Sequence, residues 1–158
     1  MTLQVQYWLH EPGQPPVEKV AELTTGDEVR AFVATLAAET VSDAILTHTT
    51  RPRVDTAIPD DERPGHYLTM PDHSVIAGIH GERGALSYRG DDGLGTEPVH
   101  LYSHGDGPEQ PVLYETDEFP PYCEIPAETI AEALTEFLET GSRPLNITWQ
   151  SGDASVLS

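Results

Sequence analysis

The chain has 158 residues and a mass of 17.3 kDa, which fits a single domain over residues 1–158. Its 27 acidic residues against 8 lysines and arginines give a net charge of −19. A nucleic acid or an anionic membrane would approach against a repulsive field, so we exclude both as direct partners. The first ten residues lack a basic stretch, and no segment nears the roughly 18 apolar residues of a membrane span. We therefore expect a cytoplasmic protein.

The first third of the chain predicts three strands and a helix. Residues 3–9 alternate between apolar and polar side chains, as in a strand with one buried face, and residues 17–23 can return beside it. Thr25 and Glu28 form a capping box, and apolar residues then recur at helical spacing, which predicts a helix over 25–40. Residues 44–49 resemble a short strand.

Residues 50–66 contain three prolines and no periodicity, so we predict a loop that no core requires. Residues 75–80 and 85–89 are predicted strands, joined in a hairpin by the GERG sequence between them. Two further strands are predicted after the glycine-flanked turn at 90–93, one over 98–102 and one over 112–115.

The C-terminal part predicts a second helix and a last strand. Pro126 suits a helix start, Ile130 to Leu138 carry apolar residues at helical spacing, and Gly141 suits the helix end. Residues 145–150 then alternate as a strand. The expected fold class is α+β, with a mostly antiparallel sheet of six to eight strands and two helices packed on one face.

The negative charge is unevenly distributed. Residues 90–142 contain no lysine or arginine and thirteen acids, so this third of the chain carries −13 of the −19. In the second helix Glu128, Glu132 and Glu136 repeat every four residues, which costs a few tenths of a kcal/mol per pair. One interpretation is a continuous negative surface, built from the hairpin turns, the loop at 116–118 and the outer face of this helix, that fits a cationic protein. The other is a solvated acidic face.

Motifs for catalysis or metal binding are absent, with no GxSxG, P-loop, HExxH, GxGxxG or CxxC. Cys123 is the only cysteine, so no internal disulfide forms; without a basic neighbour it is predicted to be a buried filler rather than a nucleophile. His100 and His104 are the closest histidine pair, but four residues on a strand span about 13 Å. We expect no metal and no cofactor.

A small-molecule-binding protein or enzyme remains an alternative. The sheet would form the floor of a pocket, with His80, His100 and Glu97 as its polar groups. Glu97, Glu115 and Asp117 could also supply a carboxylate pair for acid/base chemistry, although with 27 carboxylates some pair always qualifies.

Two tryptophans lie in predicted strands with different environments. Trp149 keeps step with Leu145 and Ile147, which favours packing in the core. Trp8 has the opposite phase from Leu3, Val5, Tyr7 and Leu9 and therefore faces away from that core. An outward tryptophan in an acidic protein is typical of an interface anchor.

Several segments together resemble the immunity protein 1 family of bacterial polymorphic toxin systems, over about residues 72–150. The most specific is the order of helix, glycine, Arg-Pro and strand-end tryptophan near the C-terminus. The matching segments are GERGALSY at 81–88, EFP at 118–120, ALTEFL at 133–138, GSRP at 141–144 and ITWQ at 147–150.

The resemblance implies a small cytoplasmic protein without catalytic activity that binds a toxin, often a nucleic-acid deaminase, and blocks its active site. The expected partner is a basic toxin domain, and a monomer is favoured. The charge points the same way, because a nucleic-acid-binding cleft is basic and an acidic inhibitor can occupy it. A diverged interaction module with no toxin partner remains a further alternative. The residues expected at the interface are Asp91, Asp92, Glu115, Asp117, Glu118 and Trp8.

Overall fold

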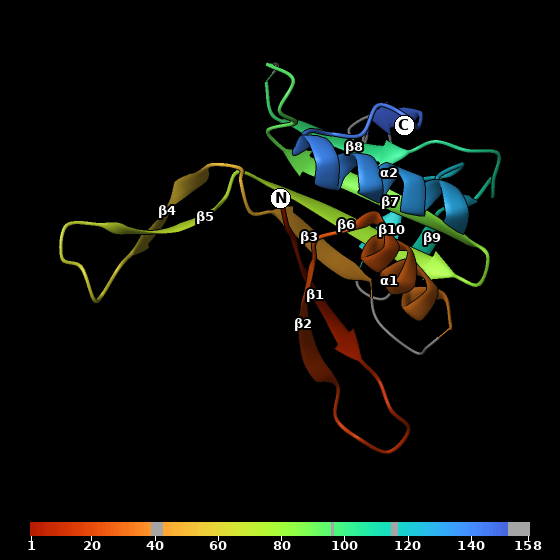
Figure 1. Cartoon of the computed structure of the whole chain (residues 1–158), viewed down its shortest axis with the longest axis horizontal. Coiled ribbons are helices and arrows are strands. Elements are labelled where there is room, and N and C mark those ends of the chain that lie inside the picture. The colour runs from red at the N-terminus through yellow and green to blue at the C-terminus, as the bar shows by residue number, and fades with distance from the viewer. Residues whose placement is uncertain (39–42, 96, 115–116, 152–158) are drawn as a thin grey trace.

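The computed structural model describes residues 1–38, 43–95, 97–114 and 117–151 (Figure 1). Its centre is an eight-stranded sheet in the order β12-β8-β7-β6-β3-β1-β2, with β11 beside β7. All pairings in this sheet are antiparallel. The strands are β1 (Leu3–Leu9), β2 (Val17–Leu23), β3 (Ala44–His48), β6 (His73–His80), β7 (Arg83–Gly90), β8 (Val99–Ser103), β11 (Ile125–Pro126) and β12 (Trp149–Ser151).

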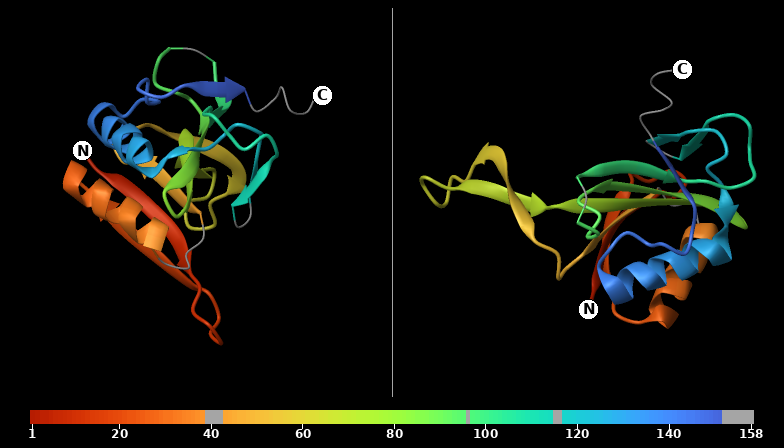
Figure 2. Two further views of the ribbon diagram at one scale, coloured as in Figure 1. Left: turned by 90° about the vertical axis from the view of Figure 1, so that its right-hand side faces the viewer. Right: turned by 90° about the horizontal axis from the view of Figure 1, so that it is seen from above.

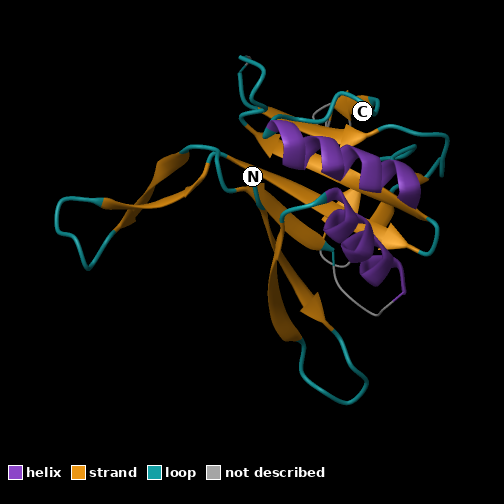
Figure 3. Cartoon of the chain, viewed as in Figure 1, coloured by secondary structure: helices purple, strands orange, loops and turns teal. Residues whose placement is uncertain are grey.

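Two helices, α1 (Gly26–Ala38) and α2 (Ala127–Thr140), cover one face of this sheet, which confirms the α+β class (Figures 1 and 3). The predicted apolar spacing of α2 is the buried one: Ile130, Leu134 and Phe137 are fully buried against the sheet. The helix ends at Gly141, whose φ of 72° is the left-handed conformation that glycine adopts without strain.

The predicted capping box starts α1 with one difference. The Thr25 hydroxyl accepts a hydrogen bond from the Glu28 amide at 3.2 Å, as expected. The Glu28 carboxylate, however, accepts from the amide and the hydroxyl of Thr24, at 2.8 and 2.6 Å. These bonds lower the pKa of Glu28. The capping box thus holds Thr24, which lies two residues before the helix, as well as the first turn of α1.

The opposite face of the sheet is partly covered by a small hairpin, β9 (Val112–Tyr114) and β10 (Asp117–Phe119) (Figure 2). Tyr114 and Phe119 pack there on Ile76 and Tyr102 in a second apolar cluster. The loop predicted at 116–118 is therefore wrong at residues 117 and 118, which lie in β10; residues 115 and 116 lie outside the described residues. A three-residue strand gives no periodicity to recognise.

The prediction of a loop over residues 50–66 is wrong in part. Within that range β4 (Arg53–Pro59) forms a strand, which pairs with β5 (Tyr67–Pro71) in the hairpin arm that projects from the body (Figures 1 and 2). Most side chains along both strands are exposed. The arm has no buried face, so its sequence does not alternate, although its independence of the core is as predicted.

A buried polar network ties the base of the hairpin arm to the core. Arg51 Nη2 donates to Asp72 Oδ2 at 2.7 Å and to Asp91 Oδ1 at 2.9 Å. His73 Nδ1 donates to Asp72 Oδ1 at 2.8 Å, and His73 Nε2 accepts from the His48 amide at 2.9 Å. This pattern requires a neutral His73, whose side chain is fully buried. Burial lowers its pKa, although the hydrogen bond to Asp72 opposes the shift.

Acid should destabilise the fold through His73. Its pKa lies below the value of about 6.5 in an unfolded chain, so the unfolded state binds more protons as pH falls. The free energy of unfolding should therefore be highest above about pH 6.5 and fall as pH drops through the folded pKa. Urea unfolding at pH 7.5 and 5.5 measures this, and H73Q should reduce the difference between the two. If H73Q and the unmodified chain lose the same free energy of unfolding between pH 7.5 and 5.5, groups other than His73 cause the loss.

Cys123 and Trp149 behave as predicted fillers of the core. Cys123 is fully buried, and burial raises the pKa of its thiol to about 12, far from that of a nucleophile. Trp149 is half-buried and packs on the main cluster, with its indole 6.5 Å from the Tyr88 ring. The last strand is shorter than predicted, since β12 begins at Trp149 and Leu145 is 65% exposed.

Candidate functional site

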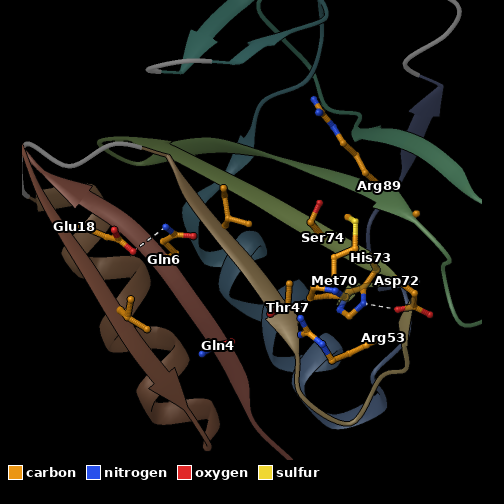
Figure 4. Close-up of a pocket in the computed structure, with 14 residues that line it drawn as sticks. Gln4, Gln6, Glu18, Thr47, Arg53, Met70, Asp72, His73, Ser74 and Arg89 are labelled. Carbon is orange, nitrogen blue, oxygen red and sulfur yellow. Dashed lines mark hydrogen bonds and ion pairs between the residues drawn. The ribbon is translucent and has the colours of Figure 1, made fainter. Parts of the chain in front are cut away.

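A groove of about 650 Å³ lies on the side of the sheet away from the helices, which we call the helix-free groove (Figure 4). Its floor consists of the outward side chains of β1, β2 and β3. Its walls come from the base of the hairpin arm, the start of β6 and the end of β7. Residues from distant parts of the chain therefore meet in one hollow.

The floor follows from the strand register. Val20, Gln6 and Ile45 are cross-strand neighbours on β2, β1 and β3, so they form one row across the floor. Val20 is 60% exposed, Ile45 is 44% exposed, and Met70 from the hairpin arm is 51% exposed beside them. Gln6 Nε2 donates to Glu18 Oε1 at 2.9 Å (Figure 4). The floor is thus an apolar surface in contact with water and bordered by polar side chains.

Two arginines belong to the walls. Arg53, at the base of the hairpin arm, donates from Nε to Thr69 Oγ1 at 2.9 Å and from Nη2 to Thr69 O at 2.8 Å. Arg89 is on β7, and its Nη2 lies 3.7 Å from Asp117 Oδ1. The Nε of Arg89 is buried and has no hydrogen-bond partner among the described residues. The walls of the groove therefore include two guanidinium groups in a strongly acidic protein, and Arg53 is the exposed one of the two.

Trp8 lies next to this groove. It is 41% exposed and shares the outward face of β1 with Gln4 and Gln6, both of which line the floor. Its cross-strand neighbour is Glu18, another lining residue. The prediction that Trp8 faces away from the core is confirmed.

The predicted acidic contacts lie in different environments. Asp91 is 47% exposed through its side chain, and bonds from the Gly93 amide and Arg51 lower its pKa. Asp117 is paired with Arg89, and Glu118 is exposed on the other side of β10. Glu115 lies outside the described residues. The structure thus places Asp117 beside Arg89, which lines the helix-free groove, although Asp117 itself does not line it.

Asp92 corrects the predicted interface. It is 1% exposed, with Oδ2 3.4 Å from Arg143 Nε and Oδ1 accepting from the Leu94 amide at 3.0 Å. The Asp92 carbonyl also accepts from the Arg143 amide at 2.8 Å. Its carboxylate therefore fastens the turn after β7 to the segment after α2, and no partner can reach it in this conformation.

Replacing Asp92 by alanine should consequently affect folding. We expect D92A to lower the free energy of unfolding by about 2 kcal/mol, because Arg143 and the Leu94 amide would lose a buried acceptor. Glu118→Ala, at an exposed position, should change it by less than about 0.5 kcal/mol. Urea unfolding compares the two; equal stabilities would contradict the structural role of Asp92.

The acidic face of α2 is exposed at Glu128, Glu132 and Glu139. Glu136 differs, because its carboxylate accepts a hydrogen bond from the Leu145 amide. The helix therefore offers acids to solvent on the side opposite to the groove.

The residues named for the small-molecule alternative do not come together at the groove. His80 stacks on Tyr114 with ring centres 4.3 Å apart, and the His100 ring lies 5.0 Å from that of Tyr102. His80, His100 and Glu97 are all absent from the lining of the groove. Among the described residues no three histidine, cysteine or acidic side chains gather as metal ligands, and no described helix has the length and apolarity that crossing a bilayer requires.

The groove was missed by reasoning from the sequence, although part of its signal was present. Val20 lies on the solvent side of a predicted strand, where a polar residue is the rule. Ile45 does the same on β3. Arg53 and Met70 could not be found in this way, since Arg53 lies in the loop predicted over 50–66 and no element was predicted for the segment that contains Met70.

The family of the chain is shown by its sequence as a whole. The model of the family described as Immunity protein Imm1 matches residues 18–151, nearly the full length and 54 residues further toward the N-terminus than the resemblance at 72–150. The match includes the groove floor on β2 and β3 as well as the hairpin arm. No curated protein matches the chain. Membership implies an immunity protein with a toxin as its partner, and the chain belongs to the Imm1 immunity protein family.

Proposed function

We propose that this protein binds a cognate basic toxin domain and neutralises it without chemistry of its own, by covering the toxin's active site with an acidic surface. The family match over residues 18–151 carries the proposal. A toxin that acts on nucleic acid, such as a deaminase, needs a positive cleft for its substrate, and an inhibitor with a net charge of −19 is drawn to that cleft.

The position of the acids supports the proposal. The segment 90–142 carries thirteen of them and no lysine or arginine. Glu118 on β10 is exposed on one side of the sheet, Glu128 and Glu132 on α2 are exposed on the other side, and Asp91 is half-exposed in the turn after β7. Asp91, Asp117, Glu118 and Trp8 remain proposed contacts. Asp92 is omitted because it is buried.

The test uses the full chain and the toxin domain encoded by the neighbouring gene. Co-expression should restore growth to cells that produce the toxin, and the purified proteins should bind with a nanomolar or lower Kd. The association rate should fall steeply between low and high salt because the steering is electrostatic. Absence of binding would contradict the function, and association insensitive to salt would contradict the acidic surface alone.

Charge reversal separates the effect of the acids in segment 90–142, which we call the acidic block, from the effect of the total charge. Glu118→Lys with Glu132→Lys should slow association about tenfold, whereas Glu11→Lys with Glu62→Lys alters the same number of exposed acids outside the block and outside the groove lining. Both variants have the same net charge, so an equal effect of the two would show that total charge, and not its position, drives binding.

A further inference from the structure

We propose that the helix-free groove receives an extended segment of the toxin that carries apolar side chains and at least one carboxylate. This inference rests on the proposed function, because it assigns the toxin a contact surface. It adds a surface other than the acidic one, and its chemistry differs from that of the rest of the molecule.

The first observation is that the apolar floor is uncovered. The helices cover one face of the sheet, and β9 and β10 cover the other face over β6 to β8 (Figure 2). Over β1 to β3 this second face has no cover among the described residues, yet Val20 and Ile45 extend from it. Met70 brings a third apolar side chain from the hairpin arm. Burial of such side chains contributes roughly 25 cal/mol per Å² removed from water.

The second observation concerns charge. Three arginines outside the walls of the groove each have a carboxylate at short range: Arg51 lies 2.7 Å from Asp72, Arg83 2.6 Å from Asp106 and Arg63 3.0 Å from Asp60. The hydrogen bonds of the Arg53 guanidinium go to the uncharged oxygens of Thr69, whereas Arg89 lies 3.7 Å from Asp117 through Nη2 and its Nε has no acceptor among the described residues. A carboxylate is the acceptor that best fits a guanidinium.

These two observations select the occupant. A polyanion such as nucleic acid would meet the field of −19, and so would a second copy of this chain. A segment with a single carboxylate avoids that repulsion when it belongs to a basic toxin, because the positive charge of the rest of the toxin is attracted to this acidic protein. The volume of about 650 Å³ and the hollow between the hairpin arm and β7 suit several side chains of a polypeptide. Trp8, on the same face of β1, would extend the contact beyond the groove.

The experiment measures binding of the full chain to the toxin domain encoded by the neighbouring gene, by titration calorimetry. Ile45→Glu, in the floor, should weaken binding at least 30-fold, as expected for a charge placed at the centre of an interface. Arg53→Glu should weaken it at least tenfold, and Arg89→Gln at least threefold. The matched controls Leu145→Glu and Arg30→Glu alter exposed residues away from the groove and should change the Kd less than threefold. Circular dichroism and Tm verify that each variant is folded.

Hydrogen–deuterium exchange on the unmodified chain gives a second readout that needs no variant. Toxin binding should slow exchange in β2, β3 and β5. If the wild-type chain does not bind the toxin, the proposed function and this inference both fail. If it binds and the groove variants bind equally well, while Glu118→Lys with Glu132→Lys binds less, the function stands and the groove assignment is overturned. A dimer of the free chain that Ile45→Glu dissociates in ultracentrifugation would also overturn it, because a second copy would then be the occupant.

Discussion

Replacing Phe137 by alanine should lower the free energy of unfolding by about 4 kcal/mol. The ring is fully buried at the centre of the core, where its centre lies 5.6 Å from the ring of His73, 5.7 Å from that of His48 and 6.1 Å from that of Tyr88. Its removal leaves a cavity beside the polar network, and two buried histidines lose an edge-on aromatic neighbour. Urea unfolding at neutral pH gives the value.

The conservative variant tests the cause. Phe137→Leu keeps most of the buried volume and should cost about 1.5 kcal/mol or less. A loss below about 1 kcal/mol in F137A would mean that the helix closes over the cavity, and a loss in F137L equal to that in F137A would point to ring contacts in place of volume.

Replacing Arg51 by alanine should lower the free energy of unfolding by about 3 kcal/mol. The Arg51 side chain is 13% exposed, and its guanidinium neutralises Asp72, whose side chain is 10% exposed. Without it a nearly buried carboxylate loses its charge partner, which is the costly way to break an ion pair. Arg63→Ala removes an arginine that is 59% exposed and bonded to Asp60, so it should cost less than about 1 kcal/mol.

A double variant identifies the source of the Arg51 effect. Asp72→Asn removes the charge but keeps an acceptor for His73, so R51A with D72N should be less destabilised than the sum of the two single variants. Additive effects would contradict the view that an uncompensated carboxylate causes the loss. Differential scanning calorimetry with urea unfolding would supply all four stabilities.

The elements predicted from sequence are those whose pattern is imposed by one buried face. β1 alternates because Leu3 and Val5 are buried and Gln4 and Gln6 are not, and α2 shows helical spacing because Ile130 and Phe137 meet the sheet. The hairpin arm has no such face, and β10 and β11 are too short to show a period. Where burial does not select side chains, the sequence carries no periodic signal.

The candidate site shows the same division. The outward direction of Trp8 depends only on strand phase and was predicted. The burial of Asp92 depends on Arg143, which is 51 residues further along the chain, so no local pattern indicates it. The helix-free groove joins side chains of β2, the hairpin arm and β7, although β6, β3 and β1 lie between β7 and β2 in the sheet and the arm is a separate pair of strands, so no local pattern indicates the groove.

The projecting arm has a consequence for how this protein can evolve. Its side chains are exposed along both strands and its pairing is internal, so substitutions between Val54 and Leu68 hardly touch the folding free energy of the body. The residues of the arm can therefore change in the course of evolution while the core beneath it stays the same.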